Sequence, residues 1–276
     1  MPDLRELLGK ERYFTEDLRR IIAILRAPGG CPWDAKQTHG SIRKNFIEET
    51  YEVVEAINKG DDALLCEELG DVLLQVALHT QMASERGAFD WDGVTDGICR
   101  KLIERHPHVF GDVRVTGVDN VLRNWDAIKR ESKGQGSTAQ AMASVPRELP
   151  ALMRAQKLQS KAAKAGFDWR EETPLRRLEF DLLGEIEELR EALLAGDLAH
   201  AQDELGDVIF SAVNIARVIP GCDAEEALTG ASDRFYARFA IVEQLATEQG
   251  VDMKAAPLEE LDRLWDLAKN SLKEKQ

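Results

Sequence analysis

Two pairs of acidic residues, separated by a turn, occur once in each half of the sequence. Each half contains Glu-x-x-Glu, then fifteen residues, then Glu-x-x-Asp. A spacing of three places both carboxylates of a pair on one face of a helix, and a short connection makes two helices antiparallel neighbours. Both pairs can therefore converge on one point. These carboxylates are Glu49, Glu52, Glu68 and Asp71 in the first half and Glu185, Glu188, Glu204 and Asp207 in the second.

Converging carboxylates need a compensating positive charge. At 4 Å, two of them repel by about 1 kcal/mol in water and about 4 kcal/mol at an effective dielectric constant of 20. No Lys or Arg recurs at corresponding positions of these helices in both halves. All-oxygen ligands favour magnesium or manganese over zinc. One pair alone would indicate a solvated helix face, but two pairs repeated at identical spacing predict a metal site.

Helices must position these acids. Within residues 62–83, apolar side chains recur three and four positions apart, as on one face of a helix. The same period runs through residues 42–57, 175–194 and 203–218. Gly60-Asp61 and Gly196-Asp197 each predict a helix-ending glycine followed by the N-cap of the next helix. Alternating β-branched runs are scarce, so we predict an all-α fold.

The two halves of the chain are copies of each other. Seven identities share one ungapped offset of 136: Gly30/Gly166, Trp33/Trp169, Glu49/Glu185, Glu52/Glu188, Gly60/Gly196, Glu68/Glu204 and Asp71/Asp207. A small, polar, glycine-bearing stretch between the copies is typical of an exposed linker. We therefore predict tandem helical-bundle domains at residues 1–131 and 147–276, joined by a linker at 132–146.

Cations and tryptophans recur downstream of each acidic motif. They form pairs at i and i+4: Lys101 with Arg105 and Trp125 with Lys129 in the first half, and Arg234 with Arg238 and Trp265 with Lys269 in the second. Each pair alone is explained by ordinary salt bridging or core packing. Magnesium, cations and an aromatic ring together are what a nucleoside polyphosphate requires, and the recurrence in both halves favours this interpretation.

Composition limits the remaining classes of function. The chain has 276 residues and a net charge of −14, which disfavours a broad nucleic-acid-binding face. We expect no membrane span and no signal peptide, and four scattered cysteines indicate reduced thiols in the cytoplasm. Cys31-Pro32-Trp33, after two glycines, predicts a tight turn anchored by a buried tryptophan. P-loop, GxGxxG and HExxH motifs are absent from the sequence.

Four motifs together resemble the MazG family of nucleoside triphosphate pyrophosphohydrolases, over nearly the whole chain. They are Gly-Gly-Cys31-Pro-Trp33-Asp, Glu48-Glu-Thr-Tyr-Glu52-Val, Glu68-Leu-Gly-Asp71-Val and Arg105-His-Pro-His-Val-Phe110. The resemblance implies an all-α homodimer that hydrolyses nucleoside triphosphates to monophosphate and diphosphate with magnesium and broad base tolerance. It implies that the eight carboxylates are the metal ligands, and that Arg234, Arg238, Trp265 and Lys269 contact the nucleotide.

The second half departs from the family motif Glu-Glu-x-x-Glu. The first half has Glu48 before Glu49, whereas the second half has Gly184 before Glu185. In some relatives the leading glutamate is the candidate general base, so the second half keeps its metal ligands but lacks that acid. Resemblance to tandem members instead implies that the second domain is the more active one. The sequence alone does not rank the two halves.

These residues predict metal-assisted attack of water on a phosphoryl group, with Glu48 taking the proton and Lys and Arg stabilising the leaving group. The resemblance implies that diphosphate leaves, so we expect the attack at the α-phosphorus. The predicted catalytic carboxylates are Glu48, Glu49, Glu52, Glu185 and Glu188. Two alternatives come from other classes of protein. One is a non-catalytic helical binding module, and the other is a di-iron carboxylate bundle, which would need Glu-x-x-His pairs that the chain lacks.

Overall fold

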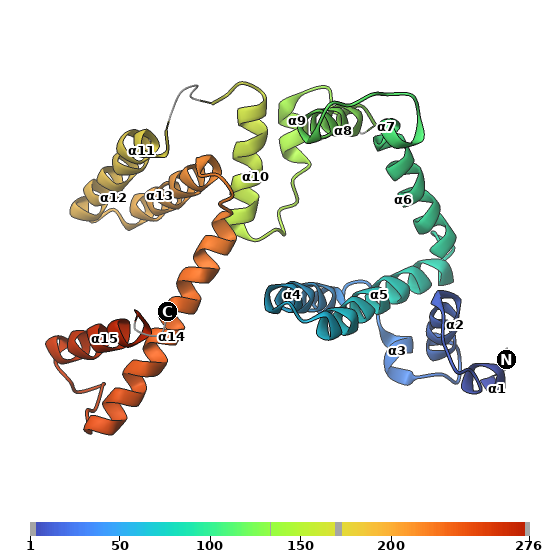
Figure 1. Ribbon diagram of the computed structural model, residues 1–276, viewed down its shortest axis with the longest axis horizontal. Coiled ribbons are helices and arrows are strands. Elements are labelled where there is room, and N and C mark those ends of the chain that lie inside the picture. Colours follow the sequence, from blue (N-terminus) through green and yellow to red (C-terminus); the bar gives the residue numbers. More distant parts are fainter. Residues whose placement is uncertain (1–3, 133, 169–172, 274–276) are drawn as a thin grey trace. The chain divides into compact units, whose positions relative to one another are not determined.

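The computed structural model describes residues 4–132, 134–168 and 173–273, and every regular element in these ranges is a helix (Figure 1). The prediction of an all-α fold is confirmed. The chain divides into two compact units, Met1–Lys129 and Arg130–Gln276. No described helix combines the length and the hydrophobicity that a membrane span requires.

The first unit is organised around the long helix α5. Its helices are α1 (Leu4–Leu8), α2 (Thr15–Arg26), α3 (Pro32–Lys36), α4 (Arg43–Lys59), α5 (Asp62–Glu85), α6 (Trp91–Arg105), α7 (Pro107–Phe110) and α8 (Val118–Ser132), whose last residues continue past the boundary of the unit. Helices α2 and α4 both pack on α5. The buried core consists of Ile22, Ile42, Ala77, Leu78 and Met82. This core fixes the α4–α5 pair that carries the first acidic motif.

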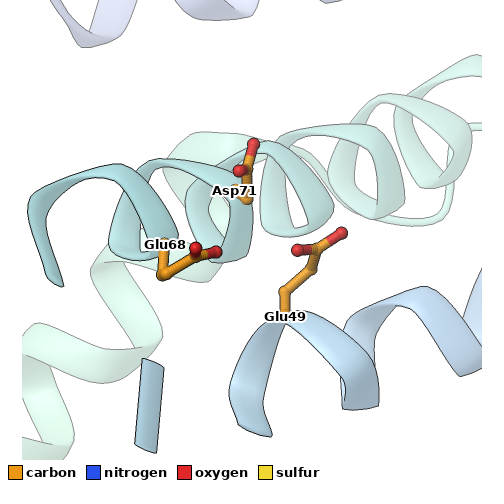
Figure 2. Close-up of side chains that lie close together, drawn as sticks. All are labelled: Glu49, Glu68 and Asp71. Atoms are coloured by element: carbon orange, nitrogen blue, oxygen red, sulfur yellow. The ribbon is translucent and has the colours of Figure 1, made fainter. Parts of the chain in front are cut away.

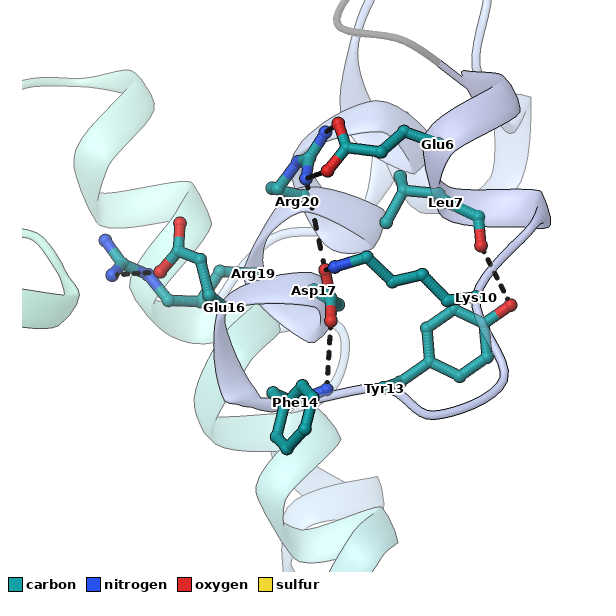
Figure 3. Close-up of polar contacts among 9 residues, drawn as sticks. All are labelled: Glu6, Leu7, Lys10, Tyr13, Phe14, Glu16, Asp17, Arg19 and Arg20. Atoms are coloured by element: carbon teal, nitrogen blue, oxygen red, sulfur yellow. Dashed lines mark hydrogen bonds and ion pairs between the residues drawn. The ribbon is translucent and has the colours of Figure 1, made fainter.

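Charged side chains hold the N-terminal segment on α2 (Figure 3). The Lys10 ammonium donates to Asp17 Oδ1 at 2.6 Å, and the Phe14 backbone N–H donates to Asp17 Oδ2 at 3.0 Å. These contacts, the hydrogen bond from Lys10 first, hold the pKa of Asp17 below its usual value. Arg20 on α2 also pairs with Glu6 on α1. Asp17 is therefore the polar centre of this part of the fold.

The second unit places another antiparallel pair, α12 and α13, beside α10. Its elements are α9 (Thr138–Ala143), α10 (Ala151–Lys164), α11 (Pro174–Arg177), the π-helical turn η1 (Leu178–Leu182), α12 (Leu183–Ala195), α13 (Leu198–Val218), α14 (Ala224–Gln249) and α15 (Leu258–Lys273). Helix α13 packs on α12 and α10, whereas α15 packs on α14. The core between α14 and α15 consists of Val242, Ala246, Leu264 and Ala268.

The predicted Gly-Asp turns are confirmed in both units. Gly60 and Gly196 end α4 and α12 in the left-handed conformation, with φ of 65° and 73°. The Asp61 carboxylate accepts hydrogen bonds from two backbone N–H groups at the start of α5, and Asp197 accepts one from the His200 N–H at the start of α13. Left-handed glycine followed by an aspartate N-cap reverses the chain within two residues. Each acidic motif therefore lies on a tight helical hairpin.

Three details differ from the sequence predictions. The helix expected over residues 175–194 is interrupted by η1. Part of the predicted linker forms α9, because Ser137 and Gln140 make a capping box that starts a helix and Ala141 is buried. Trp33 is 61% exposed, so the prediction of a buried tryptophan is wrong. Its repeat partner Trp169 lies outside the described residues. The domain limits 1–131 and 147–276 stay a prediction.

The turn before α3 is held by polar contacts instead of an apolar anchor. The Arg26 guanidinium on α2 donates to the backbone carbonyls of Asp34 and Gln37. It also forms an ion pair with Glu85 at the end of α5. Because this arginine ties α3 to both α2 and α5, the segment keeps its position without burying the Trp33 ring.

Candidate active site

Three of the four predicted metal ligands of the first half meet between α4 and α5. Carboxylate oxygens of Glu49, Glu68 and Asp71 lie within 4.8 Å of one another (Figure 2). Burial, followed by the charges of Asp71 and Glu52, raises the pKa of Glu49. Burial, followed by the charge of Glu52, raises the pKa of Glu68. Glu52 lies outside the triplet but belongs to the same electrostatic group.

The second half forms a matching cluster between α12 and α13. Carboxylate oxygens of Glu185, Glu188 and Glu204 lie within 4.8 Å of one another. Burial, followed by the charges of Asp207, Glu188 and Glu204, raises the pKa of Glu185. Glu204 is buried, and its Oε2 has no hydrogen-bond partner among the described residues. Asp207, like Glu52 in the first half, acts on the cluster from outside the triplet.

Both clusters suit a hard divalent cation. Their donors are carboxylate oxygens alone, from two helices that meet at a tight turn. Burial first, and the neighbouring carboxylates after it, raise the pKa values of Glu49, Glu68 and Glu185, because both disfavour the charged form in the absence of a cation. A buried carboxylate oxygen without a partner, as in Glu204, is a further open ligand position. The chemistry of the donor set therefore fits magnesium or manganese better than zinc.

A cavity of about 810 Å³ adjoins the second cluster. Glu185 and Glu188 on α12 belong to its wall, to which α9, α10, the segment 165–168, η1 and α13 also contribute. Most of its surface is apolar, from residues that include Met142, Leu158, Phe167, Phe180 and Phe210. A volume of this size is in the range of small-molecule sites. The second half therefore combines a carboxylate cluster with a pocket large enough for a nucleoside.

An ion-pair network braces one side of this cavity. Arg217 on α13 donates to both oxygens of Asp168, at 2.8 and 3.1 Å, and Arg177 donates to Asp168 at 2.6 Å. These hydrogen bonds, the one from Arg217 first, lower the pKa of Asp168 to about 2. Because Asp168 and Arg217 both line the cavity, the network fixes the segment before η1 against α13.

Some of the predicted nucleotide-contacting residues contact one another within each half of the chain. In the first unit, Arg105 and Lys129 lie over the Trp125 ring, at 5.3 and 4.7 Å from its centroid. Lys101 lies on the exposed surface of α6. In the second unit, Arg238 on α14 lies 5.8 Å from the Trp265 centroid. The Arg-over-Trp contact thus recurs in both halves.

The second set of these residues lies away from the cavity wall. Arg234 and Arg238 are on α14, and Trp265 and Lys269 are on α15, which packs on α14 (Figure 1). None of the four belongs to the cavity lining. Their role in nucleotide binding stays a prediction, as does that of Lys101, Arg105, Trp125 and Lys129.

Sequence reasoning missed the cavity wall. Phe180, Asp181 and Phe210 line it, but in the sequence they are ordinary positions on apolar helices. Phe180 and Asp181 lie within the π-helical turn η1 and line the cavity. No local sequence pattern indicates this turn. The role of Asp168 was not predictable either, because its partners Arg177 and Arg217 are distant in sequence and only the fold brings them into contact with it.

Comparison with known proteins decides the family. The model of the MazG nucleotide pyrophosphohydrolase domain matches residues 37–110 and 175–239. The chain belongs to the MazG family. Each match contains one acidic hairpin, so the tandem MazG arrangement expected from the repeat is confirmed. The MazG family consists of hydrolases that act on phosphoric anhydride bonds, and this chain is a hydrolase of that kind.

Named relatives extend this MazG similarity over almost the full chain. The nucleoside triphosphate pyrophosphohydrolase of Escherichia coli (strain K12) is 41% identical over 254 residues, 91% of this chain and 95% of that protein. The nucleoside triphosphate pyrophosphohydrolase/pyrophosphatase MazG of Thermotoga maritima is 40% identical over 92% of this chain and 95% of that protein. A Bacillus subtilis protein of uncharacterised function is 45% identical over 92% of this chain and 51% of its own length.

Proposed function

We propose that the protein hydrolyses nucleoside triphosphates to nucleoside monophosphate and diphosphate, with magnesium and with tolerance for different bases. The observation that carries the proposal is the pair of carboxylate clusters, one inside each MazG match. The names of the Escherichia coli and Thermotoga maritima relatives support the same reaction. House-cleaning of the nucleotide pool or stress-related control is the role that such a reaction would serve in the cytoplasm.

The ligands of each metal are proposed to be the four carboxylates of each hairpin. In the first half they are Glu49, Glu52, Glu68 and Asp71, and in the second Glu185, Glu188, Glu204 and Asp207. Three oxygens of each set already converge and the fourth carboxylate acts on them electrostatically. A bound magnesium or manganese ion would supply charge neutralisation for the polyphosphate.

The protein's own groups would then bring water to the α-phosphorus. Glu48 precedes Glu49 on α4, is exposed and is not one of the three converging carboxylates, so its carboxylate would accept a proton from the attacking water. The oxygen of that water forms a bond to phosphorus while the bond to diphosphate breaks. Lysine and arginine side chains would stabilise the charge that develops on the diphosphate.

A homodimer is proposed as the working form. Helices α12 and α13 carry large apolar side chains that are at least 42% exposed, including Ile186, Leu193, Leu205, Ile209 and Phe210. Exposed apolar surface of this extent marks an interaction face. A second copy could also bring Arg234, Arg238, Trp265 and Lys269 to a cavity whose own lining does not contain them. Light scattering during size-exclusion chromatography would test the dimer.

Product analysis tests the reaction directly. The pure protein is incubated with each nucleoside triphosphate and magnesium, and the products are separated by anion exchange. Monophosphate and diphosphate in equal amounts, abolished by EDTA, are expected. Nucleoside diphosphate and orthophosphate as products would show that water attacks the terminal phosphorus and would refute the proposal. Absence of turnover, together with absence of a magnesium-dependent thermal shift, would favour a non-catalytic binding module.

A further inference from the structure

The second half lacks the leading acid of the family motif and has a glycine at that position. Gly184 precedes Glu185 and belongs to the cavity wall. A Cβ atom added to Gly184 would meet nothing within 4 Å. The position that holds Glu48 in the first half is therefore open space in the second. An inference about the base of the second site follows from this difference, and it rests on the proposed function.

Another carboxylate reaches the same wall from one helical turn earlier. Asp181 lies four residues before Glu185, within η1, and lines the cavity. A π-turn inserts an extra residue into a helix and re-aims the side chains around it, often at functional sites. The Oδ2 atom of Asp181 is buried and has no hydrogen-bond partner among the described residues. The cavity beside Asp181 can supply the partner that the described residues do not give this carboxylate.

The other acids of the wall are already engaged. Glu185 and Glu188 are members of the metal triplet, and Asp168 is paired with Arg177 and Arg217. Asp181 is in neither group. Its charge nevertheless acts on the cluster, because after burial and the charges of Asp207, Glu188 and Glu204 it is the next cause that raises the pKa of Glu185. Asp181 is thus close enough to serve the site without being one of its converging ligands.

We propose that Asp181 is the catalytic base of the second half and replaces the acid that Gly184 has lost. Its carboxylate accepts a hydrogen bond from the attacking water and takes the proton as the water oxygen bonds to the α-phosphorus. The bond between phosphorus and the diphosphate oxygen breaks, and its electron pair leaves with diphosphate.

The test isolates the second half in the full-length chain. Glu68→Ala with Asp71→Ala disables the first cluster and provides the parent variant. Asp181→Asn is added to it, with Glu179→Gln as the matched control, since Glu179 is exposed on the same π-turn and outside the cavity lining. Turnover of Asp181→Asn is expected to fall about 100-fold or more, the usual contribution of a general base, while the control stays within twofold of the parent.

Binding measurements separate a base from a ligand. Manganese affinity, followed by electron paramagnetic resonance, and affinity for a non-hydrolysable triphosphate are expected to change less than threefold in Asp181→Asn. A loss of manganese affinity as large as that of Glu185→Gln would make Asp181 a ligand and overturn the proposal. Turnover that stays within threefold of the parent would overturn it as well.

A gain of function provides an independent check. Gly184→Glu, added to Asp181→Asn, places an acid where the first half has Glu48, in space that the structure leaves open. Turnover is expected to recover at least tenfold, and failure to recover in a protein that still binds manganese would contradict the exchange of roles. If the wild type turns over but the parent does not, the Asp181 proposal fails and the proposed function stands. An inactive wild type refutes both.

Discussion

Neutralising Glu204 should stabilise the metal-free protein and remove much of its response to magnesium. Glu204 is 7% exposed, and its carboxylate lies within 4.8 Å of those of Glu185 and Glu188. Two unit charges at 4.8 Å repel by about 0.9 kcal/mol in water and about 3.5 kcal/mol at an effective dielectric constant of 20. Glu204→Gln removes two such repulsions. The change therefore relieves about 2 kcal/mol or more before salt screens it.

Screening reduces this gain but leaves it measurable. At 0.1 M salt the Debye length is about 10 Å, so about 1–2 kcal/mol should remain. A change of that size raises the melting temperature of the second unit by about 2–8 °C. Magnesium at 100 times its dissociation constant stabilises a binding site by about 2.7 kcal/mol. Loss of one ligand should remove at least half of this magnesium-dependent stabilisation.

Differential scanning fluorimetry at pH 8 measures both effects, in EDTA and in magnesium. The Glu68→Ala/Asp71→Ala background confines the magnesium response to the second cluster. Asp203→Asn is the matched control, because Asp203 is the exposed neighbour of Glu204 on α13. If Glu204→Gln melts below its parent in EDTA, or keeps the full magnesium shift, the carboxylates are not repelling one another around an ion position.

Three further predictions concern the remaining acidic groups. Glu68→Ala/Asp71→Ala and Glu204→Ala/Asp207→Ala should each leave the activity of the other half, whereas the combined quadruple variant should be inactive; full activity in the quadruple variant would refute the ligand assignment. Asp168 has its pKa lowered to about 2 from 3.8, so its contribution of about 2 kcal/mol is present above pH 4 and is lost as the pH falls toward 2. Urea titrations between pH 5 and pH 2 should show this loss of unfolding free energy in the wild type but not in Asp168→Asn. An equal loss in the two proteins would contradict the prediction. Asp17→Asn should lower the melting temperature of the first unit because one of the two oxygens that accept from the Lys10 ammonium and the Phe14 N–H becomes an NH₂ group and the negative charge beside Lys10 is lost. The exposed Glu16→Gln should change the melting temperature little, and equal effects of the two variants would exclude this role.

The sequence predicted those parts of the site that depend on local spacing. Helical period, a left-handed glycine and an aspartate N-cap fix each hairpin from neighbours along the chain, and the i, i+3 pairs then face each other. Convergence of Glu49, Glu68 and Asp71, and of Glu185, Glu188 and Glu204, follows from that geometry. The cap contacts of Asp61 and Asp197 were predictable for the same reason.

Features that depend on tertiary packing were not predictable from spacing. The π-turn at Leu178–Leu182 changes the register of one helix, and it decides that Phe180 and Asp181 face the cavity. Trp33 was expected to be buried because tryptophan in a turn usually anchors it, but Arg26 fills that role through backbone carbonyls. Tertiary packing decides whether polar contacts or a buried aromatic ring hold this turn. The residues near position 33 alone do not predict which of the two occurs.

The Gly-Asp hairpin has a consequence for how such a protein diversifies. All four carboxylates of a cluster come from 23 consecutive residues, 49–71 or 185–207. Each copy of the hairpin therefore carries all of its proposed metal ligands in one short cassette of the sequence. Gene duplication copies such a cassette intact, and either copy can then exchange a neighbouring group without dismantling the other. The two copies already differ in such a neighbouring group, with Glu48 before the first acidic pair and Gly184 before the second.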